Sequence, residues 1–390
     1  MVDTELLVIG AGPYALSTAA LAREQGIDTT VVGRSMGFWR EHMPAGMFLR
    51  SSADWHMDAA GVDTLRAYLE DQQIRPEDVD PIPVGVFLDY AAWFTERNGI
   101  AVREDLVLGL SKADGRFEAR LQSGEVIRAG AVVAAPGVRH FTEVPAWAAE
   151  LPPDRWAHTC DLVDVSRLAG ARVAIIGGRQ SAYEWAALIA EQGAERVDVV
   201  HRHDVPRFEH VSWTFIEPHV ERTTTVPGYW RTLPQADRDA IDQRFWESGR
   251  LTLEYWLTPR LPPDRVHRWP GTEVVSVEPE ALGGAVELTL SSSHHLSVDY
   301  VVIACGYKVD LARVPYLSGV LAEIELADGF PVLDEAFQTT LDGLYVTGFP
   351  ATRDFGPFFG FVRGAPAAAT LIVRDVLAEN RSPTAATPRT

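Results

Sequence analysis

Two short glycine-rich turns hold the residues of this sequence that are best suited to binding chemistry. The first reads Gly10-Ala11-Gly12-Pro13-Tyr14-Ala15, close to the amino terminus. Gly10 allows a tight bend, Gly12 lets a pyrophosphate approach the backbone, and Ala15 permits close packing of a helix on a strand. Pro13 suits a first helical turn, where the backbone N–H is unpaired in any case. We therefore predict that this turn binds a dinucleotide through Gly10, Gly12, Pro13 and Ala15.

A second turn follows in mid-chain and reads Gly177-Gly178-Arg179-Gln180-Ser181-Ala182. Its middle glycine is replaced by Arg179, whose side chain stands where a pyrophosphate would meet bare backbone. Either Arg179 swings out and pairs with the phosphates, or it blocks the groove, and we favour pairing. The residues of this turn that we expect to contact a second dinucleotide are Gly177, Arg179, Gln180 and Ser181.

Residues further along the chain from each turn are candidates for contact with the adenosine ribose or its 2′-phosphate. Arg202 comes after the second turn at the distance where a guanidinium can hold an adenosine 2′-phosphate, which favours NADPH over NADH. The alternative is a solvated arginine in a charged loop. After the first turn, the position that usually carries a carboxylate for the ribose is Gly33, followed by Arg34. The ribose contact must therefore be made differently there, and we count Arg34 among the candidate contacts.

Strands and helices of suitable length surround both turns. The segments around the first turn are an apolar run at 5–9, an Ala- and Leu-rich segment at 16–25 and a second apolar run at 29–32, and those around the second are 172–176, 183–192 and 196–200. Both turns thus join a strand to a helix within a βαβ unit. This is the context that a dinucleotide fingerprint requires.

A third segment favours a flat ligand beside the first turn. Residues 37–51 are aromatic, Met-rich and interrupted by Gly and Pro, which suits a loop laid along a flat ring better than a helix or strand. Trp39 and Met47 become candidate contacts on this ground. The alternative is a hydrophobic loop that covers the sheet.

The carboxyl-terminal part contributes a second group of candidates. Gly348 ends a closing strand, and Phe359 and Gly360 precede an Ala-rich helix over 364–377. The first N–H groups of such a helix can face the carbonyl end of a bound ring. We therefore predict cofactor contacts from Gly348, Phe359 and Gly360.

Composition limits the function classes open to the chain. Its 390 residues allow two or three domains, and its formal net charge of −19 argues against nucleic acid and anionic membranes as partners. The two cysteines, Cys160 and Cys305, form neither a CxxC dithiol nor metal-ligand spacing, which argues against the disulfide-reductase branch of two-dinucleotide proteins. We find no signal peptide and no apolar stretch of membrane length, so we expect a cytoplasmic protein. Because no metal-ligand spacing is found, we expect no bound metal either.

Together these residues resemble the class B flavin-dependent monooxygenases, and within them the N-hydroxylating ornithine and lysine branch most. The resemblance spans nearly the whole chain, with an FAD fingerprint at 10–15, an NADPH fingerprint at 177–182 and an ATGY element matched by Ala304-Cys305-Gly306-Tyr307. Residues 39–47 and 206–218 are similar to further stretches of that branch. Gly306 and Tyr307 join the candidate cofactor contacts through this resemblance.

The resemblance implies an α/β fold of two Rossmann-like dinucleotide-binding domains, with the NADPH domain inserted into the FAD domain. The expected bounds are 1–165 and 300–380 for the FAD domain, 166–299 for the NADPH domain and 381–390 for a flexible tail. Within the NADPH domain, residues 205–263 form a Pro-interrupted, Trp-rich helical insertion, whose length is typical of functional segments. Packing explains its tryptophans equally well.

Three positions depart from the family pattern: Arg179 in the second fingerprint, Gly33 in place of the ribose carboxylate, and Cys305 in place of threonine in ATGY. The motif before the second fingerprint is only partial, since Trp156 and His158 are kept but its other positions differ. A Baeyer–Villiger assignment therefore lacks its signature.

The chemistry implied by the resemblance is carried by the cofactors, so no catalytic side chain is assigned. NADPH reduces FAD, O2 adds to give a C4a-hydroperoxide, and the distal oxygen passes to an N, S or C atom of a small molecule. Two alternatives stay open: an NAD(P)H-dependent flavin oxidoreductase or oxidase without oxygen insertion, and an FAD-binding protein that has lost NADPH use through Arg179. A small-molecule substrate and O2 are the expected partners, and a homo-oligomer is left open.

Overall fold

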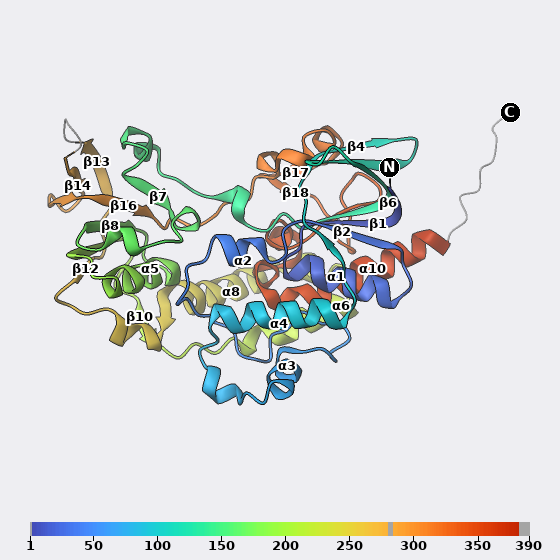
Figure 1. The fold of residues 1–390 in the computed structure, drawn as a ribbon, viewed down its shortest axis with the longest axis horizontal. Coiled ribbons are helices and arrows are strands. Elements are labelled where there is room, and N and C mark those ends of the chain that lie inside the picture. Colours follow the sequence, from blue (N-terminus) through green and yellow to red (C-terminus); the bar gives the residue numbers. More distant parts are fainter. Residues whose placement is uncertain (1, 280–283, 382–390) are drawn as a thin grey trace.

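The computed structural model describes residues 2–279 and 284–381 as two units that lie end to end along the longest axis of the molecule (Figure 1). Each unit is built on a sheet in which a parallel strand runs into a glycine turn and then into a helix. The expected α/β fold with two Rossmann-like units is therefore confirmed. Within the described residues, no helix is both long enough and apolar enough to cross a lipid bilayer.

The first unit contains a seven-stranded sheet with the order β3-β2-β1-β6-β5-β4, in which β19 also pairs with β6. The strand bounds are β1 Val2–Ile9, β2 Thr29–Val32, β3 Val102–Arg103, β4 Val107–Ala113, β5 Arg116–Leu121, β6 Val126–Ala134 and β19 Leu344–Val346. Strand β1 pairs in parallel with β2 and β6, as does β2 with β3 and β6 with β19, whereas β5 pairs in antiparallel orientation with both β4 and β6. Strand β6 joins the antiparallel strands β4 and β5 directly to β1.

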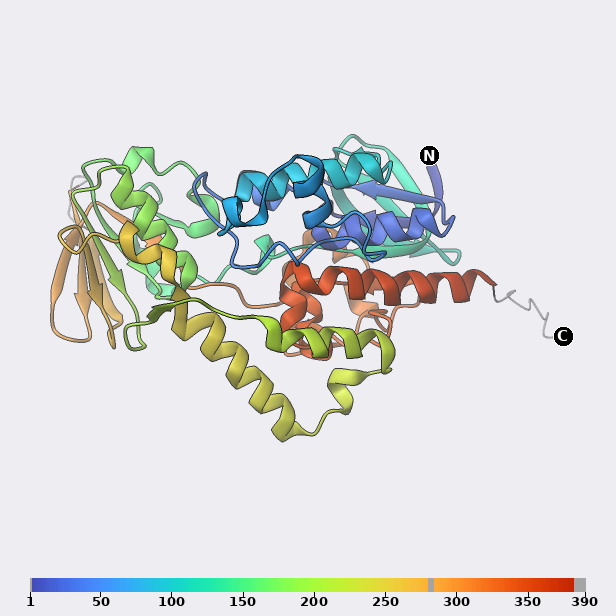
Figure 2. The same cartoon turned by 90° about the horizontal axis from the view of Figure 1, so that it is seen from below.

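Helices of the first unit bring distant parts of the chain together beside the glycine turn. Helix α1 (Pro13–Glu24) lies along α10 (Ala365–Arg381), as Figure 2 shows, and α3 (Leu65–Asp71) packs on α4 (Val84–Arg97). The Tyr14 hydroxyl lies 2.5 Å from the carbonyl oxygen of Phe359 and 2.8 Å from that of Phe361, so its single hydrogen is shared between these two acceptors. The start of α1 thereby holds the segment that leads into α10.

The second unit has a fully parallel five-stranded sheet with the order β12-β9-β8-β16-β7. The strand bounds are β7 Trp156–His158, β8 Arg172–Ile176, β9 Arg196–Val200, β12 Val266–Trp269 and β16 Tyr300–Ile303. Helix α5 (Gln180–Glu191) follows β8 and is buried along most of its length. A three-stranded antiparallel sheet of β13 (Val274–Pro279), β14 (Val286–Leu290) and β15 (His295–Val298) shares a hydrophobic core with the parallel strands.

The sheets place the boundaries between the units differently from the sequence prediction. Strand β7, at 156–158, pairs with β16, at 300–303, and both belong to the second sheet. The second unit therefore includes residues on both sides of the expected range 166–299. Short strands give little sequence signal about which sheet they join, because their pairing partners are distant in the chain. The predicted tail at 381–390 lies outside the described residues apart from Arg381, which ends α10.

The aromatic segment that follows β2 is not a simple loop. Residues Gly37–Glu41 form the short helix α2, which begins after Met36 in a left-handed backbone conformation with φ of 52°. This single turn sets the Trp39 ring against Phe87 of α4, with 4.7 Å between ring centroids. The expectation of a loop was wrong here because the aromatic side chains pack on α4 and so stabilise helical backbone.

The Trp-rich insertion at 205–263 ties the two units together. Its elements are β10 (Arg207–Glu209), α6 (Glu217–Thr225), α7 (Tyr229–Thr232), α8 (Gln235–Trp246) and β11 (Thr252–Glu254). Helix α6 packs on α10, and Figure 2 shows the two helices side by side. Trp213 and Trp230 are buried in the core of the first unit, whereas Trp256 packs at the edge of the second core. Two of the tryptophans thus serve packing between units.

A buried carboxyl group at this junction should make stability depend on pH. Glu184 of α5 accepts a hydrogen bond from the Phe48 N–H at 3.3 Å, and burial raises its pKa from 4.5 to about 8. Between these values the folded chain binds more protons than the unfolded chain, so stability falls as pH rises, by up to ~1.4 kcal/mol per pH unit. Glu184→Gln should therefore raise the melting temperature at about pH 8 more than at about pH 5. Glu195→Gln, at an exposed position just after the same helix, is the control, and equal gains for Glu184→Gln at both pH values would contradict the prediction.

Candidate functional site

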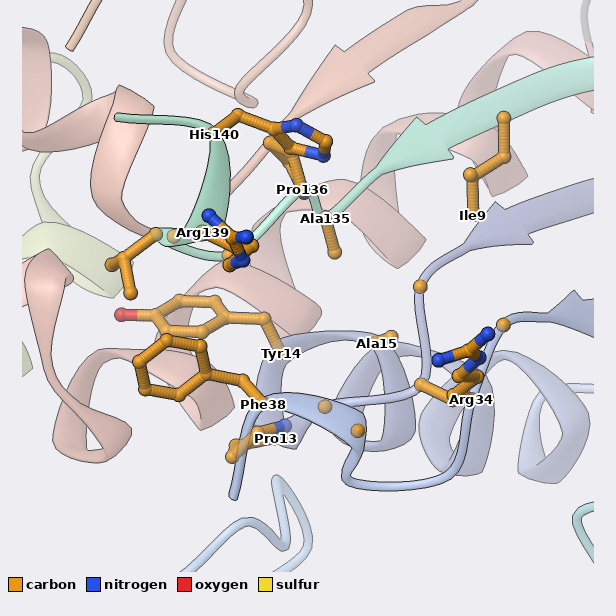
Figure 3. Close-up of a pocket in the computed structure, with 18 of the residues that line it drawn as sticks. Ile9, Pro13, Tyr14, Ala15, Arg34, Phe38, Ala135, Pro136, Arg139 and His140 are labelled. Atoms are coloured by element: carbon orange, nitrogen blue, oxygen red, sulfur yellow. The ribbon is translucent and has the colours of Figure 1, made fainter. Parts of the chain in front are cut away.

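A cavity of about 640 Å³ lies at the carboxyl ends of the parallel strands of the first unit. The segments that line it include the first glycine turn, residues 33–34 after β2, 105–108 around the start of β4, 135–140 after β6 and 347–348 after β19. Ligands of open α/β sheets bind at this edge. Figure 3 shows Arg34 toward one end of the cavity and Tyr14 with Phe38 toward the other.

The first turn fits a pyrophosphate for two steric reasons. At Gly10, with φ of +115°, a Cβ would lie 2.5 Å from the carbonyl oxygen of Ala135, so only glycine fits. At Gly12, the N-cap of α1, a Cβ would meet no atom within 4 Å. Open space therefore lies directly over the first N–H groups of a helix, where anions are stabilised by the helix dipole.

Two buried hydroxyl groups in the wall of this cavity lack partners. Neither Thr347 Oγ1 nor Tyr316 Oη has a hydrogen-bond partner among the residues that the structure describes, and their residues are only 0% and 8% exposed. Leaving such groups unpaired costs about 1–3 kcal/mol each, so a ligand with polar atoms would be stabilised there. The glycine turn and these hydroxyls together fit the phosphates and polar edge of a flavin dinucleotide.

The end of the cavity opposite Arg34 has an aromatic wall. The Phe38 ring lies 5.6 Å from that of His42, between ring centroids. His42 is held in turn, since its Nδ1 lies 2.7 Å from the carbonyl oxygen of Cys160. Burial raises the pKa of Tyr14 well above its ordinary value, so its hydroxyl stays a neutral donor. This wall suits a flat ring and keeps water away from it.

A second cavity of about 370 Å³ lies at the equivalent edge of the second unit. At Gly177, with φ of +136°, a Cβ would lie 2.3 Å from the carbonyl oxygen of Ala304, and at Gly178 it would lie 2.4 Å from Cγ of His201. Burial lowers the pKa of His201 to about 4, so its ring is neutral and is held by Tyr183 Oη at 3.0 Å. Both glycines are therefore required by close packing.

Two arginines line this second cavity, together with the carboxylate residues Glu143 and Glu273. Arg179 and Arg202 both line it, and both side chains are exposed. Burial raises the pKa of the Cys305 thiol, while the guanidinium groups of Arg202 and Arg179 oppose that shift, which places both charges near this residue. Each guanidinium group is suited to pair with a negatively charged group such as a phosphate. The phosphates of NADPH meet this requirement.

The structure brings many of the sequence candidates to the two cavities and places the others outside them. The candidates that line the first cavity are Gly10, Gly12, Pro13, Ala15, Arg34, Trp39, Gly348 and Gly360, and those that line the second are Gly177, Arg179 and Arg202. Met47 is instead buried in the core of the second unit. Gln180 is turned away, with its Oε1 accepting from the Glu254 N–H at 3.1 Å, and Ser181 lines neither cavity.

Three more candidates support a cavity wall from behind. The carbonyl of Phe359 accepts from Tyr14, and that of Gly306 accepts from the Glu143 N–H at 2.9 Å. The Tyr307 ring lies 6.5 Å from that of Phe38, between centroids. Cofactor contact by these three residues stays a prediction.

Sequence reasoning missed several cavity-lining residues. Tyr14 lies in the first glycine turn and Phe38 in the aromatic segment 37–51, and their aromatic side chains could have indicated contact with a flat ligand. Thr347 directly precedes the candidate Gly348. Tyr316 and Asp105 have no local motif, because they reach the first cavity only through long-range packing of the chain. Among residues 2–279 and 284–381, no group of three or more His, Cys, Asp or Glu side chains is arranged to hold a metal ion.

Known proteins share this architecture. The solved structure of an ornithine N-hydroxylase from Kutzneria sp. 744 has a TM-score of 0.81 with 15% identity, covering 97% of this chain and 100% of that one. A ferredoxin–NADP reductase from Salinispora tropica is 27% identical over 354 residues, 89% of this chain and 86% of that protein. An FAD-dependent urate hydroxylase from Xanthomonas campestris is 30% identical over 250 residues, which is 60% of this chain but only 51% of that relative.

The fold and the two cavities define an oxidoreductase that uses a flavin dinucleotide together with a pyridine nucleotide. Residues 7–225, more than half of the chain, match the family described as pyridine nucleotide-disulphide oxidoreductase. The chain belongs to this family. The fold implied by the resemblance to N-hydroxylating monooxygenases is confirmed by the match over nearly the whole chain.

Gly12 offers a clean test of the first cavity. Gly12→Val should fold, because its φ of −91° suits any residue and a Cβ meets no atom, but the side chain should fill the pyrophosphate space. Steric overlap of about 1–3 kcal/mol predicts roughly 5- to 150-fold weaker FAD binding, measured by flavin absorbance after gel filtration. Gly85→Val is the matched control, since Gly85 in α4 also has open space around it and lies outside the cavity. Stoichiometric FAD in Gly12→Val would contradict the assignment.

Substitutions at Arg179 distinguish a phosphate ligand from an obstruction. If its guanidinium pairs with the pyrophosphate, Arg179→Ala should weaken both NADPH and NADH binding roughly 10- to 150-fold and slow flavin reduction. Arg202→Ala is the comparison, because loss of a 2′-phosphate contact should weaken NADPH and spare NADH. Titration of both nucleotides and stopped-flow reduction measure these effects. Tighter binding and faster reduction in Arg179→Gly would show that the arginine blocks the groove.

Proposed function

We propose that this protein is an NADPH-dependent flavoprotein monooxygenase that oxygenates a small molecule at an N, S or C atom. The observation that carries the proposal is a single continuous segment that contributes residues to both cavities. Residues 135–140 line the first cavity, and the chain continues without interruption to 143–145 and Trp147, which line the second. A hydride donor and a flavin held in these cavities would meet at this common segment.

The residues of the chain bind and enclose the cofactors. When bound, FAD would supply the redox chemistry, because its ring accepts hydride from NADPH and, once reduced, activates O2. Gly12 and the start of α1 hold the pyrophosphate, and the hydroxyls of Thr347 and Tyr316 pair with polar atoms of the dinucleotide. Tyr14 and Phe38 cover the ring and exclude water, which protects reactive oxygen species from decay.

In the second cavity, arginine side chains would bind the phosphate groups of NADPH. Arg202 would bind the 2′-phosphate and Arg179 the pyrophosphate of NADPH, and Gly177 would let the backbone approach the same group; all three residues line the second cavity. We also propose that the enzyme works in the cytoplasm, where NADPH and FAD are supplied. Support for oxygen insertion comes from the hydroxylases among the proteins of similar fold and sequence.

A reductase or oxidase without oxygen insertion is the second candidate. The similarity to a ferredoxin–NADP reductase along 89% of the chain favours it, because the same two cavities serve hydride transfer alone. An FAD-binding protein that has lost NADPH use is a third, and it depends on Arg179 acting as an obstruction.

Tracing the oxygen atoms of O2 into the products distinguishes these three functions. The FAD-loaded protein would be mixed with NADPH and isotopically labelled O2 in the presence of a panel of amines, amino acids, thioethers and aromatic compounds. We expect one class to accelerate NADPH oxidation, to gain labelled oxygen by mass spectrometry and to suppress hydrogen peroxide release. Peroxide formed in proportion to NADPH with every compound would identify an oxidase, electron transfer to ferredoxin without oxygen would identify a reductase, and absence of NADPH oxidation would identify the third candidate.

A further inference from the structure

The position that usually binds the adenosine ribose cannot carry a side chain in this protein. At Gly33, directly after β2, a Cβ would lie 2.9 Å from the carbonyl carbon of Gly10 and 3.0 Å from the nitrogen of Ala11. These are backbone atoms of the first turn, so they cannot move aside without disturbing the pyrophosphate site. A carboxylate for the ribose must therefore come from another element.

The neighbouring strand β3 brings a carboxylate to the same end of the cavity. Arg103 of β3 pairs with Val32 in parallel register, and its carbonyl accepts from the Gly33 N–H at 3.0 Å. Asp105 follows two residues after Arg103 and lines the first cavity together with Gly33 and Arg34. The carboxyl ends of adjacent parallel strands meet at one edge, which explains how β3 can replace the function of β2.

The Asp105 carboxylate is fixed in place and still able to accept hydrogen bonds. Its Oδ1 accepts from the Leu106 N–H at 2.7 Å and its Oδ2 from the Ser123 N–H at 3.4 Å. The hydrogen bond with the Ser123 side chain lowers the pKa of Asp105, so the group is ionised at neutral pH. An ionised carboxylate has about four acceptor positions, which leaves room for a ribose hydroxyl.

The other charged groups nearby are already committed to protein contacts. Glu104 accepts from the Ser35 N–H at 3.0 Å and does not line the cavity. Arg34 pairs with Glu41 at 2.6 Å. Glu41 also lines the cavity, but its carboxylate is neutralised by Arg34, whereas Asp105 forms no ion pair that an arginine or lysine supplies among the described residues.

We propose that Asp105 binds the ribose hydroxyls of the adenosine half of FAD and so selects FAD over FMN, which lacks that half. The inference rests on the proposed function, because it requires FAD in the first cavity with its adenosine toward Arg34. A ribose hydroxyl would donate to the carboxylate in a charge-assisted hydrogen bond. Asp105 has a binding role and takes no part in the redox chemistry.

The test is a titration of FAD and FMN into the apoprotein, followed by flavin fluorescence. Asp105→Ala should weaken FAD binding roughly 10- to 150-fold and leave FMN binding unchanged, since removal of a charge-assisted hydrogen bond has an effect of that size. Asp105→Asn keeps oxygen and amide groups that can hold the turn, and it should also lose FAD selectively. Glu104→Gln is the matched control and should change neither affinity.

Several outcomes would overturn the inference. Unchanged FAD affinity in both Asp105 variants would show that the ribose is bound elsewhere, and equal losses for FAD and FMN would show that Asp105 only maintains the turn. Failure of the unaltered protein to bind FAD would remove both this inference and the proposed function. Selective FAD loss in a protein that oxygenates no substrate would support the role of Asp105 and remove only the monooxygenase assignment.

Discussion

Close backbone approach at two glycines is the constraint on which this structure depends. Gly10 lies against the carbonyl of Ala135, and Gly177 lies against the carbonyl of Ala304, each so closely that a Cβ would overlap the oxygen. The two contacts are equivalent in the two units. Each one presses a glycine turn onto the chain that leaves the adjacent strand, and this contact sets where the following helix begins and where a nucleotide can enter.

The residues that press on the two glycines also begin the segments that connect the two units. Ala135 begins the segment by which the chain leaves the first sheet for β7 of the second, and Ala304 begins the segment by which it returns. The residues that fix the nucleotide turns are therefore the first residues of the two crossings between units. A displacement of either connecting segment would also displace the glycine turn that it contacts, because the two are packed too closely to move independently.

The sequence predicted the parts of the fold that depend on local pattern. The strands and helices on either side of both glycine turns were predicted correctly, because the order of strand, glycine turn and helix is a local pattern of the sequence. It misplaced what depends on distant pairing: β7 and β16 belong to the second sheet, and Met47 is a core residue of the second unit. Tyr316 and Asp105 reach the first cavity from elements far apart in the chain, and nothing in their local sequence indicates it.

The Trp-rich insertion has a consequence for how independent the units are. It belongs by sequence to the second unit, yet Trp213 and Trp230 are buried in the core of the first. A fragment containing only the second unit would carry these large apolar side chains without the surface that covers them, and exposed patches of this kind promote aggregation. The second unit is thus no interchangeable module: recombination with a related reductase or hydroxylase would have to transfer the insertion and the face of α10 beneath it together.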